Sequence, residues 1–69
     1  MKKMFWARDL NCANRAKRSS ITGRSDTFNG VDTLDGQSKG FIGVISSVED
    51  VGENGLDGRQ WRVSIEVAD

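Results

Sequence analysis

Residues 59–67 constrain the fold most strongly, because from Gln60 onward polar and apolar side chains alternate strictly. The apolar members fall on one side of an extended chain and the polar members on the other. Alternation with a period of two, carried by β-branched and aromatic residues, is typical of a β-strand with one buried face. The segment therefore predicts a half-buried strand whose inward residues are Trp61, Val63, Ile65 and Val67.

A second strand is predicted over residues 41–48, which are rich in β-formers. Its apolar residues occupy both faces, which favours a central place in a sheet or burial on both sides. Gly43 within it indicates a bulge or a close approach of another backbone. The connection 49–58 is acidic and contains Asn-Gly and Asp-Gly, two turn-forming pairs. Residues 41–67 are thus expected to form an antiparallel hairpin with a long acidic tip.

The N-terminal third is consistent with two structures. A helix over about residues 6–18 would group Trp6, Leu10 and Ala13 on an apolar side and place Arg8, Asn11, Arg15 and Arg18 on a basic outer face. Alternatively, residues 3–10 and 19–22 would be strands that pair with the hairpin. Residues 23–40 are rich in Gly, Ser, Thr, Asn and Asp, which predicts a loop with one short strand near 27–34.

These elements predict one small, mainly β domain over residues 1–69, with an α+β fold as an open alternative. One architecture is a helix on a three-stranded antiparallel sheet, and the other is a five-stranded barrel of SH3-like type. In both, the hairpin 41–67 supplies the core, and the basic segment 1–24 need not be fully ordered.

The size of the chain limits its stability. A chain of 69 residues buries only about 60% of its unfolded surface, and domains this small often gain further stability from disulfides, a bound metal or oligomerisation. One cysteine and no histidine exclude an intrachain disulfide and the commonest zinc sites. Self-association, such as a homodimer, is therefore expected to add burial. The lone thiol and the absence of a long apolar run favour a cytoplasmic protein with no membrane partner.

Charge is sorted along the chain. Residues 1–24 carry seven Lys and Arg against one Asp, a net charge of +6, whereas residues 25–69 carry nine Asp and Glu against three basic residues, a net charge of −6. The net charge of the whole chain is therefore zero although its two parts carry opposite charges. Such asymmetry predicts a surface for an acidic partner, nucleic acid included.

Catalysis and metal binding are not expected. Without histidine, a Ser or Cys nucleophile lacks its usual base. Cys12 is interpreted as a small buried residue, although neighbouring Arg8 and Arg15 would favour its thiolate if it were exposed. Asp32 and Asp35 do not have the ligand spacing of a calcium loop. The sequence therefore predicts no enzyme, no metal and no cofactor.

Two binding functions remain. The favoured hypothesis is a self-associating protein-interaction module that uses a sheet edge and the acidic loop 49–58, with partner-binding residues Glu49, Asp50, Glu53, Asp57 and Trp61. Trp61 is also interpreted as a core anchor. The alternative is a nucleic-acid-binding module, because basic and hydroxyl side chains are the donors that contact phosphates. Its candidate residues are Arg8, Arg15, Lys17, Arg18 and Arg24, with Phe5 and Trp6 as candidate base-stacking rings.

Overall fold

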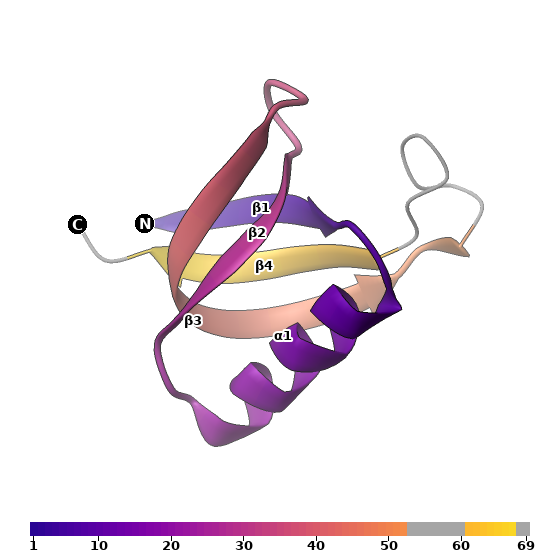
Figure 1. The fold of residues 1–69 in the computed structure, drawn as a ribbon. Coiled ribbons are helices and arrows are strands. Elements are labelled where there is room, and N and C mark those ends of the chain that lie inside the picture. Colours follow the sequence, from indigo (N-terminus) through magenta and orange to yellow (C-terminus); the bar gives the residue numbers. More distant parts are fainter. Residues whose placement is uncertain (53–60, 68–69) are drawn as a thin grey trace.

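A closed antiparallel barrel with one helix is the fold of the computed structural model, which describes residues 1–52 and 61–67. The elements are β1 (Lys2–Ala7), α1 (Leu10–Thr22), β2 (Asp26–Asp32), β3 (Ser38–Asp50) and β4 (Trp61–Val67). β1 pairs with β2 and β4, and β3 pairs with the same two strands, which closes the barrel (Figure 1). The predicted mainly β fold is confirmed, but the described residues form four strands rather than three or five.

The ribbon of β3 and β4 confirms the predicted C-terminal hairpin. Its register runs from Gly43 opposite Val67 to Asp50 opposite Trp61. Val63 and Ile65 are fully buried, while Trp61 and Val67 are half-buried at the two ends of β4 and pack against the core. The predicted inward face is therefore correct.

β3 pairs with both β2 and β4, but the expected alternative, burial of both its faces, is wrong, because Ile42 is 59% exposed. Its first half pairs with β2 and its second half with β4, and Gly43 is paired on both sides. A Cβ on Gly43 would lie 1.9 Å from the carbonyl oxygen of Glu66, so glycine is needed for the close approach of β4. A register shift follows between Ile45 and Ser47, and the hydroxyl of the extra residue, Ser46, donates to the carbonyl of Ser64 at 3.2 Å. The prediction of a close backbone approach at Gly43 is confirmed.

The core is built around aromatic residues from the strands. The rings of Phe5 and Phe41 stack with centroids 4.6 Å apart and an interplanar angle of 11°. Offset stacking of this kind adds stability beyond the buried area. Gly30 makes room for this pair, because a Cβ there would lie 2.2 Å from the Phe5 ring. Phe5 is only 1% exposed, so it cannot serve as the base-stacking ring that its sequence position suggested.

The N-terminal third combines parts of both predicted structures. Residues 2–7 form β1, and the helix spans residues 10–22, so the helix predicted over 6–18 is about four residues too early and the strand predicted over 19–22 is wrong. Asp9 explains the start, since its carboxylate accepts the Cys12 N–H at 2.9 Å as an N-cap. Gly23 explains the end, with φ of 70° and its N–H donating to the Ser19 carbonyl at 2.9 Å.

The helix packs on the barrel through small side chains. Ala13, Ala16 and Ser19 are its buried residues, and both alanines belong to the core cluster of the strands. Leu10, which was expected on the apolar side, is instead 53% exposed because the helix begins at that residue and turns it outward. The long side chains of α1 therefore face away from the barrel.

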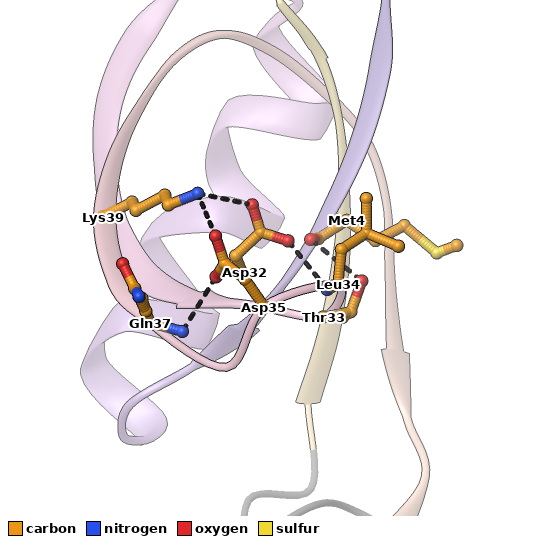
Figure 2. A network of polar contacts seen from close by, with 7 residues as sticks. All are labelled: Met4, Asp32, Thr33, Leu34, Asp35, Gln37 and Lys39. Carbon is orange, nitrogen blue, oxygen red and sulfur yellow. Dashed lines mark hydrogen bonds and ion pairs between the residues drawn. The ribbon is translucent and has the colours of Figure 1, made fainter.

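The β2–β3 turn is held by a network of polar contacts (Figure 2). The Lys39 ammonium reaches the carboxylate of the buried Asp32 at 3.4 Å and also bonds the Asp35 carboxylate. Asp32 accepts the Leu34 N–H at 2.8 Å, and Asp35 accepts the Gln37 N–H at 2.9 Å. The turn lies at the opposite end of the molecule from α1 (Figure 1).

Candidate nucleic-acid interface

The outer side of α1 carries two adjoining shallow hollows that share Arg15 and Arg18. One hollow lies along the helix, and the other lies between its C-terminal half and the connection to β2. Their linings are mainly cationic and small polar, with Ile21 in the first hollow and the Asp26 carboxylate in the second. We call their main exposed residues the basic face: Asn11, Asn14, Arg15, Lys17, Arg18, Ile21 and Arg24.

Arg15 is fixed in place by the strand beside it. Its guanidinium lies 2.9 Å from the Asp26 carboxylate and 5.4 Å from the centroid of the Phe28 ring. The Thr27 backbone N–H and the Arg15 guanidinium lower the pKa of Asp26. About half of the Arg15 side chain (52%) remains exposed, so it is oriented yet accessible. Pre-orientation reduces the entropy that a binding group loses when it meets a ligand.

Three other cations of the basic face are not neutralised by the described part of the chain. Lys17, Arg18 and Arg24 are exposed, and none of them forms an ion pair with residues 1–52 or 61–67. The Ser19 hydroxyl donates to the carbonyl of Arg24 at 3.0 Å, which ties the α1–β2 connection to the helix. These side chains therefore present unpaired positive charge over one continuous surface.

Arg8 is separate from this group. It precedes α1, donates to the Ser38 hydroxyl at 2.8 Å and lines neither hollow. Of the five basic residues proposed from the sequence, the structure thus brings together four and directs the fifth to the start of β3.

The residues proposed for an acidic partner site lie at the far end of the β3–β4 ribbon. Glu49 is opposite Arg62, whose guanidinium it meets at 2.9 Å, and Asp50 is opposite Trp61. Trp61 packs against the core and is half-buried, as a core anchor would be. The other two residues of that proposal, Glu53 and Asp57, lie outside the described residues.

The closed barrel limits the sheet edge that a partner could use. Each of the four strands pairs with two neighbours over at least part of its length. Unpaired backbone is what attracts an added strand. The edge expected from the sequence is therefore confined to the positions where pairing stops.

Cys12 does not have the environment of a reactive thiol. Burial, followed by the neighbouring Asp9 carboxylate, raises the pKa of the Cys12 thiol, and the side chain packs against the core. The two arginines named as possible activators do not offset this, because Arg8 turns to Ser38 and Arg15 to Asp26. No group of three or more His, Cys, Asp or Glu gathers around a metal-sized site in the described part of the chain.

Sequence reasoning placed Asn11 on the basic outer face of the helix but missed Asn14 and Ile21. Asn11, Asn14 and Ile21 share one stripe with Arg18 at spacings of three and four residues, the spacing of a single helix face. Ile21 is 84% exposed, so its side chain is accessible on this face of the helix. Correct helix boundaries would have grouped these residues in advance.

No protein-family model matches this chain, and no curated protein or solved structure matches it either. Within the described residues, none of the helical structure has the length and apolar character needed to cross a bilayer. The function must therefore be inferred from the surface itself.

Proposed function

We propose that this chain is a non-enzymatic module that binds nucleic acid through the basic face of α1. The observation that carries the proposal is the set of unpaired cations, Lys17, Arg18 and Arg24, gathered beside the oriented Arg15. Lys and Arg that neutralise phosphates supply most of the affinity of sequence-independent binding. The short polar side chains between them are further donors to phosphate oxygens.

The neutral net charge does not oppose this proposal. Several carboxylates are matched by cations outside the unpaired group, since Asp32 and Asp35 meet Lys39 and Glu49 meets Arg62. These pairs do not involve Lys17, Arg18 or Arg24, so the positive charge of the basic face is not offset by them. A local field, rather than the total charge, governs encounter with a polyanion.

The test is the salt dependence of binding to a fluorescently labelled DNA, measured by anisotropy. Each phosphate contact contributes about 0.9 to the slope of log affinity against log salt. Arg18→Ala and Lys17→Ala should each weaken binding and reduce the slope by roughly that amount. The matched control is Lys2→Ala, an exposed lysine of β1 that lines neither hollow. Absence of binding at low salt, or equal losses in Lys2→Ala, would reject the proposal.

A second candidate is self-association or binding of a protein partner through the end of the β3–β4 ribbon. It is supported by the exposed Asp50, whose negative charge complements the basic face of another copy, whereas the neighbouring Glu49 is paired with Arg62. Trp61 at the same end would add apolar area. Sedimentation should then detect a dimer that dissociates as salt increases and that Asp50→Asn weakens. A monomer at high protein concentration and low salt would contradict the self-association.

A further inference from the structure

We propose that the basic face of α1 binds in the major groove of double-stranded DNA and that Asn11 and Asn14 contact base edges there. This inference rests on the proposed nucleic-acid binding. The alternatives are a single strand, an RNA duplex, and contact with phosphates alone. Aromatic placement, side-chain chemistry and helix geometry together separate duplex DNA from these.

Aromatic placement argues against a single-stranded ligand. Proteins that bind single strands stack exposed rings on successive bases. Here Phe5, Phe28 and Phe41 are buried in the core, and the two tryptophans are half-buried on β1 and β4. None of the five rings lines either hollow of the basic face. The basic face therefore offers a single strand cations for its phosphates but no exposed ring on which its bases could stack.

The stripe along α1 has the chemistry of base-edge contacts. Asn11 and Asn14 are exposed amides that project outward from successive turns, followed by Arg18 and the strongly exposed Ile21. Asparagine pairs with adenine through two hydrogen bonds, arginine pairs with guanine, and an apolar side chain contacts the thymine methyl group. Amides also donate to phosphates, so it is the alignment of the two amides with Arg18 in one row along the helix that favours contact with base edges.

The helix geometry suits the major groove of B-form DNA. α1 has 13 residues, which corresponds to roughly 20 Å of length. Its barrel side is closely packed through alanines, so its outer side stands clear of the strands (Figure 1). The major groove of DNA is about 12 Å wide and admits a helix, whereas the major groove of an RNA duplex is too deep and narrow for side chains to read. Arg15 and Arg24, beside the stripe, are then placed to meet phosphates of the groove wall.

The experiment selects ligands from a randomised pool of DNA duplexes and compares the recovered duplex with its separate strand and with an RNA duplex of the same sequence. The expected result is an enriched base preference, tighter binding of the DNA duplex than of either competitor, and a roughly five- to 150-fold loss of affinity in Asn14→Ala. Alanine favours a helix more than asparagine does, so this variant should fold. The matched control is Asn29→Ala, an exposed asparagine on β2 that lines neither hollow.

Two results would overturn the inference while leaving the proposed function intact, provided that Arg18→Ala still reduces affinity. One is equal or tighter binding of the single strand or the RNA duplex. The other is a selected pool with no enriched bases. An equal loss in Asn14→Ala and Asn29→Ala would also overturn the assignment of the asparagines. Failure to bind any nucleic acid at low salt would overturn both proposals together.

Discussion

Replacing Gly43 with alanine should destabilise the barrel where β3 meets β4. An added Cβ would lie 1.9 Å from the carbonyl oxygen and 2.8 Å from the carbonyl carbon of Glu66. Both atoms belong to the backbone of a strand paired on two sides, so neither can rotate away. Overpacking of this kind costs about 1–3 kcal/mol, and the reduced freedom of the unfolded chain offsets only about 0.4–1 kcal/mol of it.

A domain of this size loses about 4–8 °C in melting temperature for each kcal/mol. Circular dichroism melts should therefore show Gly43→Ala unfolding roughly 5–15 °C below the unmodified chain. The matched control is Gly40→Ala in the same strand, where the added Cβ would meet only the Asn29 side-chain oxygen at 3.5 Å. That variant should melt at the same temperature or slightly higher. Equal melting temperatures for the two variants would refute the close approach of β4 at Gly43.

Three further predictions follow from individual side chains. Asp26→Asn should strengthen DNA binding in the anisotropy assay, because removing a negative charge beside Arg15 should outweigh the loss of its orientation; a weaker affinity would show that the orientation of Arg15 by Asp26 matters more than the charge. Burial raises the pKa of Cys12, so the pH at which its reaction with a thiol reagent reaches half its maximal rate should be higher than for a free cysteine. The reaction should also accelerate when the chain unfolds. A half-maximal pH lower than that of a free cysteine would contradict the packing of Cys12. The Lys39 ammonium lowers the pKa of Asp35 in the folded chain. The ion pair therefore stabilises the fold above the unfolded pKa of Asp35, and this stability is lost as the pH falls through the lower folded pKa. Asp35→Asn should reduce this loss of stability at acid pH in unfolding measurements, and an unchanged pH profile would contradict the pairing.

The β ribbon was predictable because its signal is local. Alternation from Trp61 to Val67 specifies which side chains face inward whatever surrounds the strand, and Val63 and Ile65 are buried as expected. Gly43 was also informative, because a glycine inside a β-forming run often marks a bulge or a close backbone approach. Closure of the barrel was not predictable, since it depends on β1 pairing with β4 some sixty residues away in sequence.

The N-terminal helix was located only approximately, because its inward face is made of alanine and serine. A helix that buries Ala13, Ala16 and Ser19 has only small side chains on its inward face, so Trp6 and Leu10 shifted the expected helix about four residues toward the N-terminus, although Ala13 was correctly expected on the inward side. The reliable signal was Asp9 before the helix and Gly23 after it, a cap at each end. A helix with these two ends adds Asn14 and Ile21 to Asn11 and Arg18, which the sequence had already placed on the outer face.

The charge pattern predicted a basic surface but not which cations are available. Seven basic residues in the first 24 are equivalent in the sequence, yet Arg8 and Arg15 are bonded to Ser38 and Asp26. Of the cations that form no ion pair with the described residues, Lys17, Arg18 and Arg24 lie on the helix and its C-terminal connection, while Lys2 and Lys3 lie on β1. Pairing of this kind depends on the distance between side chains in the fold, which no linear pattern contains.

The most direct test of nucleic-acid binding by α1 is an amide NMR titration of the labelled chain with a DNA duplex at low salt. The prediction is that shift changes concentrate on residues 11–26 and spare the β2–β3 turn, which lies at the other end of the molecule (Figure 1). Addition of salt should reverse them, because the contacts are with phosphates. A spectrum unchanged by DNA, or changes confined to the turn or to the far end of the β3–β4 ribbon, would contradict the assignment of the basic face as the binding surface.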